Sequence, residues 1–303
     1  MNAIALKDVN KQFGQVKAVE HLSLEVPKNC IYGFIGPNGS GKTTTLRMIM
    51  DILPPDSGLI EVFGQTLRGP CTDRIGYLPE ERGLYRRMKV RDLLRFYGRL
   101  KSGRDVSRQA DVWLDRFDLG GWANKKVETL SKGMSQKVQF IATVVGEPDL
   151  LVLDEPFTGL DPVNLDVIRQ AILDLQRRGA TVILSTHDMG IAEQMCDFIF
   201  MIFQGRKVLD GTLESIQEQF GHDVLRIATD EGQSPPADLE GVESVRDHGH
   251  MQELRLRPGS DPQQILRALM EKARLVRFEI ARPSLHDIFV RIAGPQAQEK
   301  PHA

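Results

Sequence analysis

The sequence predicts an α/β fold with a largely parallel sheet, followed by a second, smaller α+β domain. Up to about residue 219, short apolar runs rich in β-branched residues alternate with segments of helical periodicity, the order typical of such a sheet. Beyond that point, apolar and charged residues alternate, as they do in strands with one face in water. A length of 303 residues, of which 41% are hydrophobic and 26% charged, provides enough apolar material for two cores.

Three short, continuously apolar runs in the first part are predicted to be buried strands. A glycine-rich turn and an amphipathic helix over residues 46–53 follow the first of them. Another helix is predicted over residues 165–178, ended by Gly179. Between about residues 85 and 146 strand signals are few, which indicates a helical subdomain within domain 1–219. The three predicted strands are Ile31–Ile35, Leu150–Leu153 and Thr181–Leu184.

Residues 220–295 are predicted to form the small accessory domain, and residues 296–303 a flexible tail. Residues 261–273 are predicted to form a helix, because an N-cap aspartate and a proline at the first helical position open this segment. Ser284 and Asp287 cap a short final helix. The predicted strands of this domain are 224–228, 253–257 and 276–280, with a turn-rich linker at 232–236.

The composition argues against several classes of protein. The 39 Lys and Arg residues against 41 Asp and Glu give a formal charge of −2, so no nucleic-acid partner is expected. The three cysteines form neither a disulfide nor a zinc pattern and are typical of a reducing compartment. The N-terminus has no signal-peptide pattern. The longest apolar stretch, Phe198–Phe203, is far shorter than the ~18 residues that span a bilayer, so we expect no membrane crossing.

One segment departs from the balanced charge. Residues 82–108 contain ten Lys or Arg residues and only two acids. We interpret this segment as an exposed helix face. The alternative is a surface that rests near anionic lipid or near an acidic loop of a partner.

A glycine-rich loop follows the first predicted strand and precedes a helix, and its sequence matches G-x-x-x-x-G-K-[ST]. The glycines let backbone N–H groups face a phosphate, and the helix presents its positive N-terminus to the same anion. Lys42 adds a positive charge, and the hydroxyl of Thr43 is a ligand for Mg²⁺. The alternative, an ordinary glycine turn, does not explain the strand and helix around it. The loop residues are Gly36, Pro37, Asn38, Gly39, Ser40, Gly41, Lys42 and Thr43.

Two carboxylates end the second predicted strand. Asp154 and Glu155 follow Leu150–Leu153, at the carboxyl edge where open α/β sheets bind ligands. We expect Asp154 to hold Mg²⁺, directly or through water. We expect Glu155 to orient or deprotonate an attacking water.

With these motifs in place, residues 1–219 resemble the ATP-binding subunits of ABC transporters, whose motifs occur here in the family's order. The resemblance implies a P-loop NTPase fold, ATP and Mg²⁺ as ligands, and ATP hydrolysis as the activity. It assigns the loop from Gly36 through Thr44 to ATP as the Walker A motif. Phe13 stands where the family places an aromatic residue that stacks on adenine, with a core phenylalanine as the alternative. The other matching motifs are the signature Leu130-Ser131-Lys132-Gly133-Met134, the D-loop Thr158-Gly159-Leu160-Asp161 and the switch histidine His187.

Two motifs depart from the family pattern. Glu80 stands where most members carry the glutamine of the Q-loop, and an ionised carboxylate cannot donate a hydrogen bond. In the signature, Lys132 replaces a glycine and Met134 replaces the glutamine. Ser131 as N-cap and the backbone of Gly133 are retained, so we carry over the phosphate contact to these two residues. The expected catalytic residues are Glu80, Glu155 and His187.

A narrower resemblance rests on segments 79–83, 131–134 and 283–289, which are similar to the ATPase subunits of bacterial ABC-2-type exporters, including the sodium-extrusion type with an extra C-terminal domain. The resemblance to the ABC family as a whole implies a dimer, expected to be a homodimer, that closes head to tail around two ATP molecules, so that Ser131, Gly133 and Asp161 complete the nucleotide sites. It also implies an integral membrane permease as the partner. The expected location is therefore the cytoplasmic face of the inner or plasma membrane, through that permease.

Two other functions fit the sequence less well than transport does. An ABC ATPase that acts on ribosomes or DNA is the alternative, but one glycine loop, no sustained heptad repeat and no basic excess argue against it. A kinase would not explain the signature and the switch histidine. For the C-terminal domain, a dimer contact, regulation and ligand binding stay open. His248 and His250, expected on one face of a strand, lack the further ligands of a metal site.

Overall fold

The computed structural model describes residues 2–66, 73–81, 83–221, 224–230, 239–257 and 259–294. The chain divides into two compact units, Met1–Thr212 and Leu213–Ala303. This division lies earlier than the boundary near residue 219 that we expected, because the first helix after Thr212 is bonded to the C-terminal unit. The linker expected at 232–236 and the tail expected at 296–303 lie outside the described residues.

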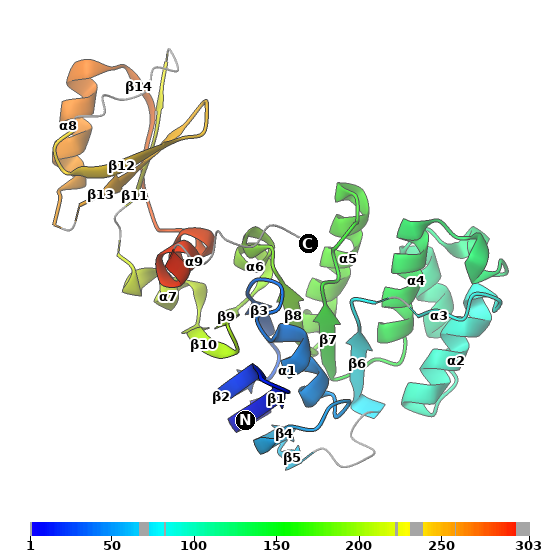
Figure 1. Cartoon of the computed structure of the whole chain (residues 1–303). Coiled ribbons are helices and arrows are strands. Elements are labelled where there is room, and N and C mark those ends of the chain that lie inside the picture. Colours follow the sequence, from blue (N-terminus) through cyan, green and yellow to red (C-terminus); the bar gives the residue numbers. More distant parts are fainter. Residues whose placement is uncertain are drawn as a thin grey trace. The chain divides into compact units, whose positions relative to one another are not determined.

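The first unit is built on a six-stranded sheet of order β10-β9-β3-β8-β7-β6 (Figure 1). All of its neighbouring strands are parallel except β10, which runs antiparallel to β9. The three strands predicted from continuous apolar runs are confirmed as β3, β7 and β8, and all of their residues are buried. The strands are β3 (Ile31–Ile35), β6 (Ile75–Leu78), β7 (Leu150–Asp154), β8 (Thr181–Thr186), β9 (Phe198–Phe203) and β10 (Arg206–Gly211).

A second, antiparallel sheet of order β2-β1-β4-β5 belongs to the same unit. The N-terminal segment forms its two long strands, which are not among the predicted elements. This sheet shares one core with α1 and with one face of the six-stranded sheet. Its strands are β1 (Asn2–Phe13), β2 (Val16–Pro27), β4 (Ser57–Val62) and β5 (Gln65–Thr66).

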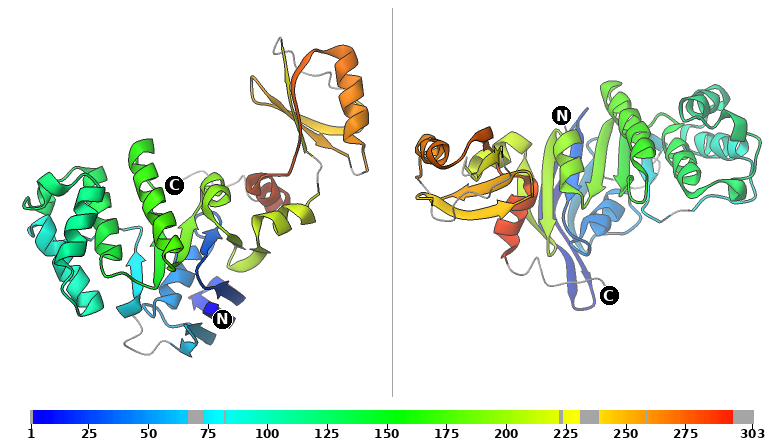
Figure 2. Two further views of the ribbon diagram at one scale, coloured as in Figure 1. Left: turned by 180° about the vertical axis from the view of Figure 1, so that it is seen from behind. Right: turned by 90° about the horizontal axis from the view of Figure 1, so that it is seen from above.

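Helices other than α1 complete the first unit on the other side of the six-stranded sheet. Side chains of β7 alternate between the two cores: Leu150 and Val152 face the antiparallel sheet, whereas Leu151 and Leu153 face the helical segment. Helices α2, α3 and α4 gather beside β6, at the edge of the six-stranded sheet (Figures 1 and 2). The helices are α1 (Lys42–Ile49), α2 (Val90–Ser102), α3 (Ser107–Arg116), α4 (Lys132–Val144), α5 (Pro162–Arg177) and α6 (Met189–Met195), with short 3₁₀ turns η2 (Gly120–Trp122) and η3 (Val127–Thr129).

The second unit is a four-stranded antiparallel sheet of order β12-β13-β11-β14 with a helix, α8, packed on one face. The predicted N-caps are confirmed, since Asp261 accepts from the backbone N–H of Gln263 and Ser284 forms a capping box with Asp287. The elements are α7 (Leu213–Gln219), β11 (Val224–Thr229), β12 (Val242–Asp247), β13 (Gln252–Leu256), α8 (Pro262–Lys272), β14 (Leu275–Ala281) and α9 (Leu285–Ala293).

Two details of this unit differ from expectation. Helix α7 belongs to it because Gln217 donates to the carbonyl of Pro283 at 3.0 Å and Glu214 pairs with Arg282 at 3.0 Å. His248 and His250 lie in the turn between β12 and β13, not on a strand. No group of three potential metal ligands occurs among the described residues.

Candidate active site

The glycine-rich loop joins β3 to α1 at the carboxyl end of the six-stranded sheet. Gly36 has φ +149° and Gly41 has φ +110°, and a Cβ at either position would lie within 2.5 Å of a backbone carbonyl oxygen. Both positions therefore require glycine. Gly41 is the N-cap of α1 and offers no side chain to the helix, so the first backbone N–H groups of α1 have no side-chain cap. Such an N-terminus binds an anion.

Lys42 is buried although it carries a charge. Its Nζ donates to the carbonyls of Gly36 at 2.7 Å and Pro37 at 3.1 Å. Burial lowers the pKa of Lys42, while the nearby carboxylates of Glu155, Asp154 and Glu80 act in the opposite direction. The ammonium group thus has acidic neighbours but no direct ion pair among the described residues, and it can exchange carbonyl contacts for a phosphate.

Asp154 lies at the end of β7, with 1% of its surface exposed. One carboxylate oxygen, Oδ2, accepts from the hydroxyl of Thr43 at 2.9 Å. The other, Oδ1, is buried without a hydrogen-bond partner in the part of the chain that the structure describes. Burial raises the pKa of Asp154, and the hydroxyls of Ser185 and Thr43 compensate only in part. A buried oxygen of this kind is available to a cation.

Glu155 follows Asp154 in the left-handed conformation, with φ +50°. Its Oε1 accepts from the backbone N–H of His187 at 2.9 Å and contacts the ring Nδ1 of His187 at 2.8 Å. Its Oε2 accepts from the hydroxyl of Thr158 at 3.3 Å. The strained turn and these three contacts hold the carboxylate at the edge of the sheet, and the structure brings Glu155 and His187 together.

Lys42, Asp154 and Glu155 line one cavity of about 440 Å³, whereas His187 does not line it. The loop and the start of α1, including Thr44, form one wall, and Glu80, Asp154 and Glu155 form another. Sequence reasoning missed four further lining residues, which lie at the start of β2 and in the turn after β9, where no motif occurs: Val16, Lys17, Ala18 and Gln204.

A smaller cavity of about 50 Å³ lies behind Glu155. Glu80 and Glu155 line both cavities. In the smaller one they meet two buried glutamines of α4, Gln136 and Gln139, which sequence reasoning also missed. Gln136 donates to the carbonyl of Thr158 at 2.8 Å, and this contact ties the signature helix to the loop that holds Glu155.

The remaining expected site residues do not line the larger cavity of a single chain. Phe13 is 50% exposed, which excludes the core alternative. Ser131 is the N-cap of α4 and accepts from the N–H of Met134 at 3.2 Å, and Gly133 lies in the first turn of that helix. Asp161 caps α5 through the N–H groups of residues 163 and 164, and these bonds lower its pKa.

The two departures in the signature also have a structural account. The side chain of Met134 packs against the core of the helical segment. The Nζ of Lys132 lies beside Gly159 of its own chain, 3.4 Å from where a Cβ of that residue would be. Neither side chain interrupts the cap that Ser131 provides.

Comparison with known proteins agrees with this geometry. Residues 19–158 match the ABC transporter family, and residues 211–293 match the C-terminal domain of DrrA1-3-like ATP-binding proteins. The chain is 39% identical to the ABC transporter ATP-binding protein YhaQ of Bacillus subtilis, over 96% of this chain and 98% of that protein. It belongs to the ATP-binding proteins of ABC transporters. The Nod factor export ATP-binding protein I of Burkholderia lata is 32% identical over 98% of both chains.

Solved structures support the same conclusion. An ATP-binding subunit of an ABC transporter superposes with a TM-score of 0.68 at 30% identity, covering 72% of this chain and 93% of that one. The chain is therefore an ABC ATPase, as its ordered motifs indicated. ABC ATP-binding subunits of exporters work with membrane permease partners. In the described portion of this chain, no helix has the length and apolarity needed to cross a bilayer.

Proposed function

We propose that this ABC ATPase energises export through a separate integral membrane permease of the ABC-2 type. The observation that carries the proposal is the match along almost the whole chain to a Nod factor export ATP-binding protein, joined to a DrrA-like C-terminal domain. The permease holds the chain at the cytoplasmic face of the inner or plasma membrane. The formal charge of −2 supports a role without a nucleic-acid partner.

In this proposal, the loop from Gly36 through Thr44 holds the phosphates of ATP. The backbone N–H groups and Lys42 contact the β- and γ-phosphates, and the cavity of about 440 Å³ has room for a triphosphate. Thr43 and Asp154 would hold Mg²⁺, for which the unpartnered buried Oδ1 of Asp154 is a suitable ligand. The cation would neutralise phosphate charge.

Glu155 orients and activates the water that attacks the γ-phosphate. His187 keeps the carboxylate in position through its backbone N–H and its ring. Glu80 lines the same cavity beside Asp154 and Glu155 and completes the catalytic set, where its negative charge favours a cation rather than a phosphate.

The rest of the site comes from a second, identical chain. Ser131 and Gly133 expose a helix N-terminus that supplies donors to the γ-phosphate bound by the partner. Asp161 contributes by anchoring the D-loop to α5, since its carboxylate is engaged by its own helix. The exposed ring of Phe13 stacks on adenine. Closure around two ATP molecules, and opening after hydrolysis, drive the permease.

Replacement of Glu155 by glutamine tests the mechanism. Glutamine retains the size and an acceptor oxygen but cannot take a proton, so the Glu155→Gln variant should bind ATP normally and hydrolyse it about 10²–10⁴-fold more slowly. Phosphate release measures turnover, and sedimentation with and without ATP and Mg²⁺ measures the closed dimer, which should accumulate. Glu147→Gln, at an exposed position, is the control. Unchanged turnover in Glu155→Gln would remove this residue from the mechanism.

A second experiment separates export from action on ribosomes or DNA. The tagged chain is purified from a detergent extract of its own cells, and the co-purifying proteins are identified. Recovery of a polytopic membrane protein supports the proposal. Recovery of ribosomes, or of DNA that salt does not release, would contradict it.

A further inference from the structure

Strand β14 of the second unit has a free edge. It pairs with β11 on one side, and no other described strand pairs with it on the other. Proteins usually protect such edges with short strands, prolines, charges or a covering helix. The opposite edge strand, β12, follows this rule, because three of its six residues, Glu243, Arg246 and Asp247, are charged. Strand β14 has seven residues, of which two are charged, and contains no proline.

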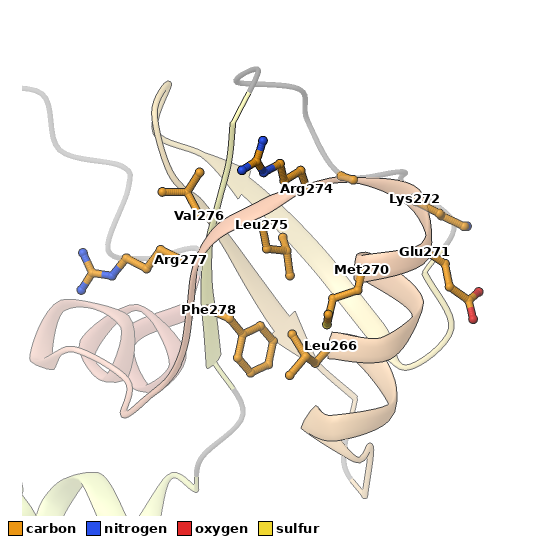
Figure 3. Close-up of a pocket in the computed structure, with 10 residues that line it drawn as sticks. Leu266, Met270, Glu271, Lys272, Arg274, Leu275, Val276, Arg277 and Phe278 are labelled. Atoms are coloured by element: carbon orange, nitrogen blue, oxygen red, sulfur yellow. The ribbon is translucent and has the colours of Figure 1, made fainter.

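Strand β14 exposes apolar side chains alongside its two charged residues. Val276 is 67% exposed and Ile280 is 44% exposed, and Met270 on the neighbouring helix α8 is 66% exposed. A groove of about 650 Å³ lies between the end of α8 and β14. Figure 3 shows the side chains of Met270 and Phe278 directed into the space between this helix and the strand.

The ladder with β11 defines the two faces of this edge. Phe278 opposes Ile227, a residue of the core beneath α8, so Phe278 is on the helix side. Arg277 and Glu279 alternate with it and lie on the other side, where they form an ion pair with each other. The edge therefore presents an apolar row on one face and a pair of opposite charges on the other.

We propose that this edge binds a second copy of the same chain, β14 against β14, in an antiparallel pair centred on Phe278. A two-fold axis at Phe278 places Arg277 of each chain opposite Glu279 of the other. The two charged pairs are then complementary, and the two Phe278 rings meet on the α8 side. A shift of the centre to Arg277 would instead place two arginines opposite each other. The charge pattern thus specifies both the partner and the register.

The contact extends the sheet across both copies and closes the apolar groove of each. It needs no nucleotide, because every residue involved belongs to the second unit. It therefore keeps two chains together while the ATP sites are empty, beyond the nucleotide-driven closure of the proposed function. The β14 contact and the ATP-driven contact between two chains can be tested separately by experiment.

Charge reversal tests the pairing in the full chain. Arg277→Glu and Glu279→Arg each place like charges opposite each other in a homodimer. Each variant alone should weaken nucleotide-free dimerisation at least tenfold in sedimentation velocity over a concentration series. Mixed in equal amounts, the two variants restore both opposite-charge pairs, and the dimer should return. Circular dichroism confirms that both variants are folded.

Two results would overturn the pairing. One is a wild-type chain that stays monomeric without nucleotide at concentrations of tens of micromolar, and the other is single variants that dimerise like the wild type. A second set of measurements adds ATP and Mg²⁺ to Glu155→Gln combined with Arg277→Glu. Closure in this double variant shows that loss of the β14 contact leaves the ATP-driven contact intact, so failure of one does not imply failure of the other.

Discussion

Asp154 combines nearly complete burial with one oxygen that has no hydrogen-bond partner among the described residues. Burial raises its pKa, so the folded protein binds this proton more tightly than the unfolded chain does. Protonated Asp154 therefore favours the fold at low pH. As the pH rises through the unfolded and then the folded pKa, the charged form appears and this stabilisation is lost.

The Asp154→Asn variant without nucleotide should thus be more stable than the wild type at neutral pH. Asparagine keeps an oxygen for Thr43 but carries no charge. We expect the melting temperature to rise by about 2–4 °C, the effect of about 1 kcal/mol in a domain of this size. The gain should shrink as the pH falls toward the ordinary pKa of aspartate, and calorimetry over a pH series measures it. A gain that does not vary with pH would contradict this account.

Thr158 links two parts of the site. Its hydroxyl donates to Glu155, and its carbonyl accepts from Gln136 of the signature helix. Removing the hydroxyl in Thr158→Val should let Glu155 turn away and lower kcat about tenfold, while KM for ATP changes little, because a hydrogen bond to a charged group contributes about 1.5–3 kcal/mol. Thr158→Ser should restore kcat. If the valine and serine variants were equally slow, Thr158 would not position Glu155.

Contiguous motifs made part of this site predictable from sequence. The loop at Gly36, the carboxylates Asp154 and Glu155, and His187 each follow a buried strand, and strand ends meet at one edge. Gln136 was not predictable, because a glutamine inside an amphipathic helix carries no signal of its own. Its role depends on the fold that brings α4 against the loop at Thr158.

At the level of elements, continuous apolar runs predict buried strands most reliably. Strands β3, β7 and β8 are buried on both faces and need no alternation to be recognised. The long strands β1 and β2 escaped notice because their pairing contains several register shifts. Each shift breaks the two-residue period on which strand prediction rests.

The start of α5 illustrates a second limit of prediction from sequence, the position at which a helix begins. We predicted it at residue 165, but the helix begins at Pro162. Asp161 accepts from two backbone N–H groups, and Pro162 takes the first helical position, which is a strong helix start. The family resemblance places the same aspartate in the D-loop, and a D-loop assignment says nothing about a capping role. One residue here serves the helix and the loop together.

At the scale of the whole molecule, the two units have separate cores. Among the described residues of the first unit, one hydrophobic cluster lies on each face of the six-stranded sheet. The second holds its own cluster between its sheet and α8. The residues of the nucleotide cavity all belong to the first unit, and β14 belongs to the second. A ligand that binds one unit stabilises that unit by mass action.

Calorimetry of the Glu155→Gln variant should therefore show two transitions with different dependences. ATP with Mg²⁺, which this variant hydrolyses slowly, should raise only the transition of the first unit, by about 2.7 kcal/mol of stability at a hundredfold excess over Kd. The midpoint temperature of the second unit's transition should not change with nucleotide. It should rise with protein concentration, because pairing through β14 is bimolecular. Arg277→Glu serves as the control that removes this concentration dependence. A single transition that shifts as a whole with ATP would show that the two units unfold as one, despite their separate cores.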